Sequence, residues 1–183
     1  MIKSRRTEEG RVIGTLVHLW LERIANDGPD QWSEIDIRKS SELFRVQLGA
    51  QGVPHARLQH CAATVETCLI NTLGSDRGRW LLEDHPDAKS ELAINGMIDG
   101  KLVRATIDRT FVDQTGNRWV IDYKTSAPPS DGMDRESFLL EEKVRYQDQL
   151  WVYLKLIRQL YPGQPACAAL YFPLFDGWIT VDE

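Results

Sequence analysis

The chain has 183 residues, with 22 Lys and Arg against 27 Asp and Glu, which gives a net charge of −5. This length suits one ordinary domain with a full hydrophobic core. The acidic balance taken alone argues against a nucleic-acid-binding protein, because such proteins usually carry a basic surface.

The composition and the first residues indicate a cytoplasmic protein or an excised domain. Apolar residues make up 42% and charged residues 27% of the chain, as in ordinary globular proteins. No apolar run is long enough for a membrane span, and residues 1–10 lack the apolar stretch of a signal peptide. We therefore expect no membrane association.

Three cysteines are present, at Cys61, Cys68 and Cys167. Their number is odd and no two of them have C-x-x-C spacing, so the sequence predicts neither a disulfide framework nor a zinc site. We expect ordinary buried thiols.

The first part of the chain is predicted to be helical. Apolar residues recur at helical spacing over residues 10–26. Two further helices are expected, one over about 34–49 with room for a break near its acidic start, and one over about 55–73. Gly74 and Gly78 are expected to end this helical part.

The apolar pattern then changes to a period of two, which predicts three strands at residues 90–98, 101–112 and 118–126. Asp99-Gly100 is a strong two-residue hairpin turn, and residues 114–116 suit a three-residue loop with glycine in the left-handed position.

A long helix and two closing strands complete the predicted chain. The helix covers about 135–160, and the strands cover 166–175 and 177–182. Helices therefore precede three strands, which are followed by one helix and two strands. This order predicts an α/β fold around one mixed sheet.

The two predicted turns fix the pairing of the first three strands. They pair Ile98 with Lys101 and Asp113 with Asn117. Glu91 is then opposite Asp108, and Asp108 is opposite Asp122, so three carboxylates form a row across adjacent strands. The opposite, core face is then formed by Leu92, Ile94, Ala105, Ile107, Ile121 and Tyr123. This agreement supports the register, because a slip of one residue would exchange the faces.

A row of like charges destabilises a sheet unless a cation lies between them. Mg²⁺ and Mn²⁺ prefer oxygen ligands, and Lys124, on the face of Asp122, would place a positive charge where a phosphate approaches. These groups suit metal-assisted phosphodiester hydrolysis. The alternative interpretation is that Asp122 and Lys124 form an ion pair on a solvated face.

Two helices carry further candidate residues. His18 shares a helical stripe with Gly14 and Glu22, and imidazole can ligate Mn²⁺, although a lone helical histidine is more often structural. In the last helix, Gln149 lies within an aromatic stripe with Tyr146 and Tyr153. Such a stripe usually belongs to the core, but a buried amide needs partners.

These motifs together resemble a known family. The pattern of Asp108 followed by Asp122-Tyr123-Lys124 looks like the core of the PD-(D/E)xK nucleases. The G-T-L-V-H of residues 14–18 and the Y-x-x-Q-L-x-x-Y of residues 146–153 resemble the nuclease domain at the C-terminal end of RecB- and AddA-type helicase–nuclease subunits. The resemblance covers residues from about 10 to 175.

The resemblance implies roles for the residues at matching positions. Metal binding would fall to His18, Asp108, Asp122 and the Tyr123 carbonyl, and catalytic roles to Glu91, Asp108, Asp122, Lys124, Gln149 and Tyr153. Lys124 would orient the attacking water or neutralise the phosphate, while Gln149 and Tyr153 would support Lys124 and the DNA phosphate. Further side chains are available for phosphates, namely Lys101, Arg104, Arg109, Arg118, Lys143 and Arg145.

The resemblance also implies a fold. It is a restriction-endonuclease-like α/β core, with a mixed central sheet flanked by helices and preceded by an N-terminal helical segment. We expect residues 1–183 to form a single domain, with the helical part at about 10–74 and the catalytic sheet and helix at about 88–183.

The implied function is that of a Mg²⁺- or Mn²⁺-dependent deoxyribonuclease, an exonuclease similar to exodeoxyribonuclease V that acts in DNA recombination and repair. Its implied partners are DNA and the helicase domains or subunits of a RecBCD- or AddAB-type complex. Some relatives carry a four-cysteine iron–sulfur cluster, which three scattered cysteines cannot form, so none is expected. The alternatives are an inactive nuclease-like binding module in a larger DNA-processing complex, and another metal hydrolase or a restriction-type endonuclease.

Overall fold

The computed structural model describes residues 8–130 and 132–181, and the chain divides into two compact units. The helical unit comprises the chain up to Glu83 together with Pro173–Asp176, and the sheet unit comprises Asp84–Phe172 and the chain from Gly177 onward. Residues 1–7 lie outside the described residues. They include most of the segment that is predicted to lack a signal peptide. That the whole chain forms a single nuclease domain stays a prediction.

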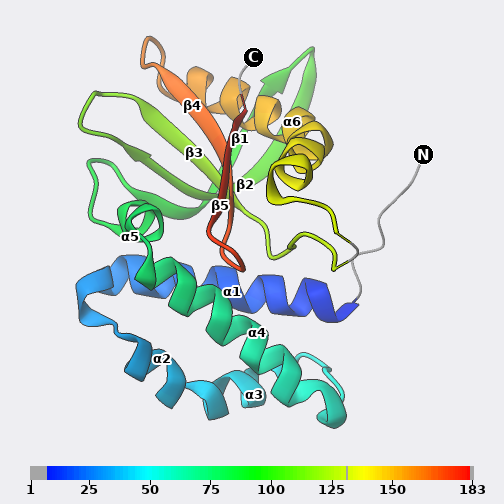
Figure 1. Ribbon diagram of the computed structural model, residues 1–183. Helices are drawn as coiled ribbons and strands as arrows, with labels where there is room; N and C mark the ends of the chain where they lie inside the picture. The colour runs from blue at the N-terminus through cyan, green and yellow to red at the C-terminus, as the bar shows by residue number, and fades with distance from the viewer. Residues whose placement is uncertain (1–7, 131, 182–183) are drawn as a thin grey trace. The chain divides into compact units, whose positions relative to one another are not determined.

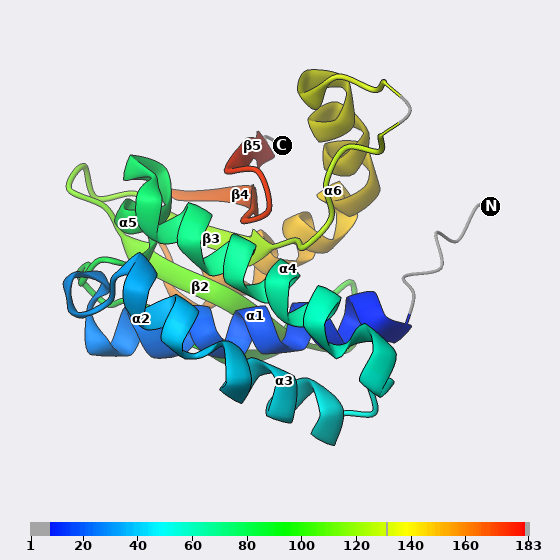
Figure 2. The ribbon, with the colours of Figure 1, turned by 60° about the horizontal axis from the view of Figure 1, so that its bottom comes forward.

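The helical unit confirms the predicted helices. Its elements are α1 (Glu8–Asp27), the 3₁₀ turn η1 (Pro29–Gln31), α2 (Glu34–Lys39), α3 (Ser41–Ala50), α4 (His55–Gly74) and α5 (Asp76–Leu82). The expected break separates α2 from α3 at Ser40. α1 contacts α3, α4 and α5 (Figure 2). Trp20 of α1 packs edge-on against Phe44 of α3 at 4.8 Å between ring centroids.

One boundary prediction was wrong, because Gly78 does not end the helical part. It lies inside α5, which begins when Ser75 accepts the Gly78 backbone N–H at 2.8 Å and caps the new helix. A Cβ atom at Gly78 would lie 2.1 Å from the Thr72 carbonyl oxygen. The glycine therefore permits a close approach between consecutive helices, rather than terminating a helix.

The four residues between the last two strands belong to the helical unit. The Asn71 side-chain amide of α4 donates to the carbonyl oxygens of Pro173 and Leu174, at 3.1 and 2.8 Å. The Ser75 hydroxyl donates to Asp176 at 2.8 Å. The turn thus satisfies polar groups of α4 and of the α5 cap.

The sheet unit is the predicted mixed sheet with one long helix. Its elements are β1 (Lys89–Ile98), β2 (Lys101–Val112), β3 (Arg118–Tyr123), α6 (Arg135–Leu160), β4 (Ala166–Phe172) and β5 (Gly177–Val181). The strands lie in the order β1-β2-β3-β4-β5, and only β3 and β4 are parallel among these described strands. Parallel neighbours need a long crossover, which α6 supplies. α6 contacts β1, β3, β4 and β5 (Figure 1).

The predicted register of the first three strands is confirmed. Asp99 and Gly100 both have positive φ, 48° and 74°, as a tight hairpin turn requires, and Ile98 pairs with Lys101. Asp113 donates its N–H to the Asn117 carbonyl at 2.9 Å. Beyond that loop, the ladder continues to the pair of Arg109 and Ile121.

The predicted core face is buried or half-buried along its length. Ile94, Ile107, Ile121 and Tyr123 are buried, while Leu92 and Ala105 are half-buried. No described helix is long and apolar enough to cross a membrane.

Candidate active site

Asp122 and Lys124 form a buried ion pair at the end of β3. Asp122 is 3% and Lys124 6% exposed, and Lys124 Nζ lies 2.5 Å from Asp122 Oδ2. The ammonium also lies 4.0 Å from the centre of the Tyr146 ring, a favourable cation–π contact. Charged side chains are rarely buried this fully unless they are paired. The alternative of an ion pair on a solvated face is therefore wrong.

The last helix holds the second oxygen of Asp122. Gln149 Nε2 donates to Asp122 Oδ1 at 3.0 Å and to the Tyr153 hydroxyl oxygen at 2.6 Å. The half-buried amide within the aromatic stripe of α6 thus has hydrogen-bond partners on β3 and on its own helix. Both Asp122 oxygens therefore have protein partners, Gln149 at Oδ1 and Lys124 at Oδ2.

Asp108 is tied to the backbone beside Asp122. The half-buried Asp108 accepts the Tyr123 backbone N–H on Oδ2 at 2.7 Å. This bond lies just beyond Arg109 and Ile121, the last paired residues of β2 and β3. The carboxylate therefore joins the two strands where their ladder ends, and it fixes the position of one predicted site residue relative to the next.

Glu91 interrupts the ladder between β1 and β2. The register passes from the pair of Ser90 and Arg109 to the pair of Leu92 and Ile107, with Glu91 opposite Asp108 between them. Glu91 has a φ of 48°, in the left-handed region that costs a residue with a Cβ atom about 1–2 kcal/mol. Such strain often accumulates at functional sites.

The carboxylates suit a divalent cation. One oxygen of Glu91 and one of Asp108 lie within 4.8 Å of each other. Carboxylate oxygens are the ligands that Mg²⁺ and Mn²⁺ prefer, at roughly 2.1 Å for Mg²⁺, so a small side-chain movement would let one ion bind both. His18 lies half-buried on α1, in the helical unit. The roles of His18 and of the Tyr123 carbonyl as ligands stay predictions.

The two tyrosines beside these acids remain protonated at neutral pH. Burial raises the pKa of the Tyr153 hydroxyl to about 12, and the nearby negative charge of Asp122 adds to this effect, although the Gln149 hydrogen bond opposes it. Burial likewise raises the pKa of Tyr123. Neither hydroxyl is therefore available as a general base.

The cysteines lie in both units. Cys61 and Cys68 are buried in the helical unit, and Cys167 is half-buried on β4. Burial raises the pKa of both Cys61 and Cys68, to about 12 for Cys68. Protonated thiols are poor metal ligands. The absence of an iron–sulfur cluster stays a prediction.

Two residues proposed to contact phosphates are buried instead. Arg109 is 3% and Arg118 2% exposed. Arg118 binds Asp87 at 2.5 Å and Gln164 at 2.8 Å, and it lies 3.6 Å from the centre of the Tyr161 ring. Arg118 therefore stabilises the far end of the sheet, and the expectation of phosphate contacts by these two arginines was wrong.

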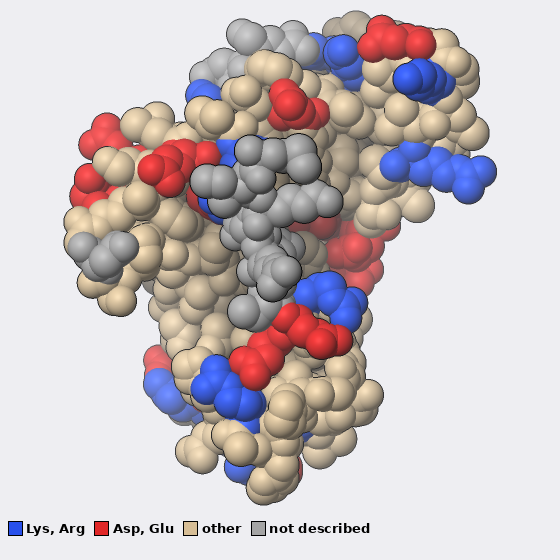
Figure 3. All heavy atoms as spheres, turned by 90° about the vertical axis from the view of Figure 1, so that its right-hand side faces the viewer, with Lys and Arg blue, Asp and Glu red and all other residues tan. Residues whose placement is uncertain are grey.

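Figure 3 shows the charged side chains of the described residues. Lys and Arg side chains are interspersed there with Asp and Glu, in keeping with the excess of acidic residues in the chain. Lys101 and Arg104 are exposed on β2, so both remain available for phosphates.

Sequence reasoning missed Glu142 of α6. This residue is 1% exposed, accepts the Ser126 hydroxyl at 3.1 Å and pairs with Arg145. A signal was present, because Glu142 lies four residues before Tyr146 and therefore continues its helical stripe toward the N-terminus.

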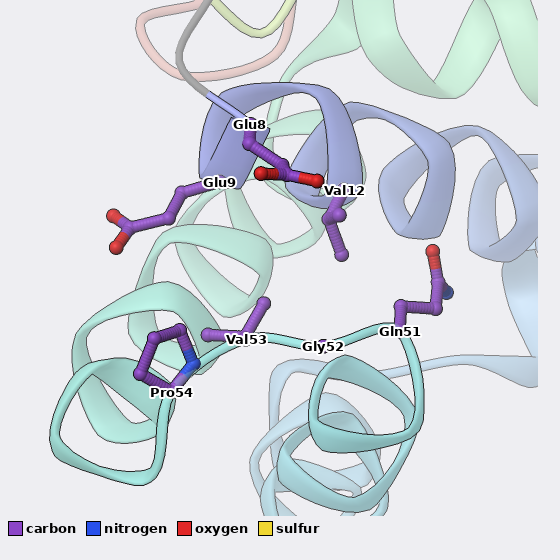
Figure 4. Close-up of a pocket in the computed structure, with 7 residues that line it drawn as sticks. All are labelled: Glu8, Glu9, Val12, Gln51, Gly52, Val53 and Pro54. Atoms are coloured by element: carbon purple, nitrogen blue, oxygen red, sulfur yellow. The ribbon is translucent and has the colours of Figure 1, made fainter.

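A separate hollow of about 400 Å³ lies in the helical unit, at the start of α1 and the loop before α4 (Figure 4). It is lined by Glu8, Glu9, Val12, Gln51, Gly52, Val53 and Pro54. None of these is a predicted site residue, and Glu9 pairs with Arg57 at its edge. Apart from His18, the predicted site residues lie in the sheet unit.

Comparison with known proteins shows the family of the chain. Residues 2–177 match the PD-(D/E)XK nuclease superfamily. The chain is also 25% identical over 185 residues to an ATP-dependent helicase/deoxyribonuclease subunit of Lactococcus lactis subsp. cremoris (strain SK11), a match that covers 94% of this chain and 16% of the relative. The predicted family resemblance and restriction-endonuclease-like fold are confirmed: the chain belongs to the PD-(D/E)XK nuclease superfamily.

Proposed function

We propose that this nuclease-superfamily chain is a deoxyribonuclease that uses Mg²⁺ or Mn²⁺ to hydrolyse phosphodiester bonds. The observation that carries the proposal is the buried contact between Lys124 and Asp122 at 2.5 Å, close in sequence and structure to the Asp108 bond with Tyr123. A buried ammonium paired with a carboxylate suits a site that must balance both a cation and a phosphate.

The acids provide the cation site. In this proposal Glu91, Asp108 and Asp122 contribute oxygens, and the Tyr123 carbonyl and His18 complete the set. A bound divalent ion would supply hydroxide near neutral pH and offset negative charge on the phosphate.

The remaining residues hold and balance this site. Lys124 places a positive charge where negative charge develops on the scissile phosphate, and such preorganised charge favours the transition state over the bound substrate. Gln149 fixes the orientation of Asp122, and Tyr153 accepts the second hydrogen bond of the same amide. Tyr146 holds Lys124 on one side.

The finer assignment follows the relative's name. That protein is a helicase/deoxyribonuclease subunit, so we propose that this chain is an exonuclease similar to exodeoxyribonuclease V, in the cytoplasm. Its partners would be DNA and the helicase domains or subunits of a RecBCD- or AddAB-type complex that acts in recombination and repair. The chain spans about a sixth of the length of that relative.

The test uses end-labelled linear DNA and closed circular DNA, incubated with Mg²⁺, Mn²⁺ or EDTA. An exonuclease degrades the linear DNA when either metal is present and leaves the circle intact. Asp122→Asn should abolish this activity, while Asp148→Asn, an exposed acid on the same helix as Gln149, should not. Cleavage of the circle would indicate an endonuclease. DNA binding without cleavage in any metal would favour an inactive binding module.

A further inference from the structure

The polar residues of α6 contact alternate residues at and beyond the end of β3. Glu142, Tyr146, Gln149 and Tyr153 are spaced by four, three and four residues, which places them on one stripe of the helix. Gln149 contacts Asp122, Tyr146 contacts Lys124, and Glu142 contacts Ser126. The first two contacts involve residues of the proposed active site, whereas the third involves neither an acid nor a lysine of that site.

Glu142 needs its partners, because burying a carboxylate is costly unless it is hydrogen-bonded and paired. Its Oε2 accepts the Ser126 hydroxyl at 3.1 Å, and its Oε1 pairs with the Arg145 guanidinium. The Arg145 side chain is 47% exposed, whereas that of Glu142 is 1% exposed. The contact with Ser126 therefore joins a buried group of the helix to the chain that follows Lys124.

This contact lies close to Lys124 along the backbone. β3 ends at Tyr123, and Lys124 donates its N–H to the Tyr171 carbonyl at 2.9 Å. Two residues later the chain is held by Ser126. The backbone is thus held at Lys124 by its own N–H and again at Ser126 by Glu142, so the Glu142 contact restrains the segment that carries the Lys124 side chain.

We infer that Glu142 is a positioning residue, which holds Ser126 and thereby keeps the Lys124 ammonium between Asp122 and the Tyr146 ring. The catalytic part of this inference rests on the proposed nuclease function. The positioning itself does not, because the location of Lys124 relative to an aromatic ring can be measured without any DNA.

The experiment therefore has two readouts. One is the single-turnover rate of DNA cleavage with Mg²⁺, with DNA affinity measured separately in Ca²⁺. The other is the NMR resonance of the Lys124 ε-carbon in protein carrying ¹³C-labelled lysine, assigned by its loss in Lys124→Arg. The Tyr146 ring, 4.0 Å away, shifts this resonance, so movement of Lys124 changes its position.

Ser126→Ala and Glu142→Ala are expected to move the Lys124 resonance and to lower the cleavage rate at least about tenfold, with DNA affinity changed less than about twofold. The double variant should be no worse than the single ones, because both changes remove one contact. Glu142→Gln should restore most of the rate, since its amide oxygen can still accept from Ser126. Glu141→Ala, an exposed neighbour, should behave like the parent.

Other outcomes would overturn the inference. An unmoved Lys124 resonance in Ser126→Ala would show that the contact does not position the lysine, and this variant decides the matter even if Glu142→Ala does not fold. A loss of rate in Arg145→Gln equal to that in Ser126→Ala would assign the effect to the ion pair. If the parent cleaves no DNA with any metal, the proposed function fails, while the resonance still decides for or against the positioning role.

Discussion

Lys124 and Asp122 neutralise each other at 2.5 Å with less than a tenth of either side chain exposed. The two residues share one face of the strand, as a period of two requires. Their pairing contributes to the stability of the fold in addition to its role in the proposed chemistry. Removing one partner would leave the other as an uncompensated buried charge.

Asp122→Ala is therefore expected to lower the free energy of unfolding by about 3–5 kcal/mol. If repulsion among Glu91, Asp108 and Asp122 dominated instead, Asp122→Ala would raise the free energy of unfolding. Replacing both partners in Asp122→Ala/Lys124→Met should recover most of the loss, because no unpaired charge remains. Urea unfolding without metal measures both values, and unchanged stability in the single variant would show that the pair contributes little.

Lys124→Ala is expected to act on turnover more than on binding. The single-turnover cleavage rate should fall roughly 10²-fold, as for the loss of one charge-stabilising donor, while DNA affinity in Ca²⁺ stays within a few-fold. Lys124→Arg should not restore the rate, because a planar guanidinium does not replace a compact ammonium between Asp122 and the Tyr146 ring. Lost affinity with a normal rate would make Lys124 a DNA-docking residue.

Glu91→Gly is expected to stabilise the protein and to weaken cleavage. Glycine adopts a φ of 48° without steric cost, so the free energy of unfolding should rise by about 1 kcal/mol. Glu91→Ala removes the same carboxylate but keeps a Cβ atom, and it should give no such gain. Equal stabilities of the two variants in urea would mean that the backbone at this position is not strained.

Tyr153→Phe is expected to change the dependence of stability on alkaline pH. The pKa of Tyr153 is raised from 10.0 to about 12 in the folded protein, so the folded state holds this proton more tightly than the unfolded state does. The resulting stabilisation is complete below pH 10 and is lost as the pH rises through 12. The variant should therefore lose less stability across this window. If the free energy of unfolding changed equally with pH in parent and variant, the raised pKa of Tyr153 would be contradicted.

Gly78→Ala is expected to destabilise the helical unit by about 2–3 kcal/mol, because the new methyl group would overlap the Thr72 carbonyl. Gly74→Ala is the matched control, since nothing lies within 4 Å of a Cβ atom built there. Thermal unfolding of both variants distinguishes a steric requirement at Gly78 from a general preference for glycine near the end of α4.

The sheet could be predicted from sequence because its signals are local. Asp99-Gly100 and Gly116 specify their turns, and alternating apolar residues specify which face is buried. Together they fixed the register that brings Glu91 opposite Asp108. The contact between Asp122 and Lys124 follows from the same period, which places them on one face.

The remaining features depend on contacts between distant residues. A glycine at position 78 is typical of a helix end. In the structure it is required instead because the Thr72 carbonyl leaves no room for a Cβ atom. The sequence around Arg118 is typical of a surface position, but contacts with the distant Asp87 and Tyr161 bury it. Glu142 stands between Glu141 and Lys143, a run typical of a solvated helix face. Its spacing to Tyr146 indicates the buried stripe, but its contact with Ser126 could not be predicted from the local sequence.

The turn between β4 and β5 has a consequence for how the protein can be divided. Because Pro173–Asp176 belongs to the helical unit, the backbone passes from one unit to the other three times, after Glu83, after Phe172 and after Asp176. A fragment ending at Glu83 would lack the carbonyl groups that accept the Asn71 amide. Protease cleavage near Glu83 should accordingly leave two pieces that remain associated, because Pro173 and Leu174 of the second piece still bind Asn71 of the first.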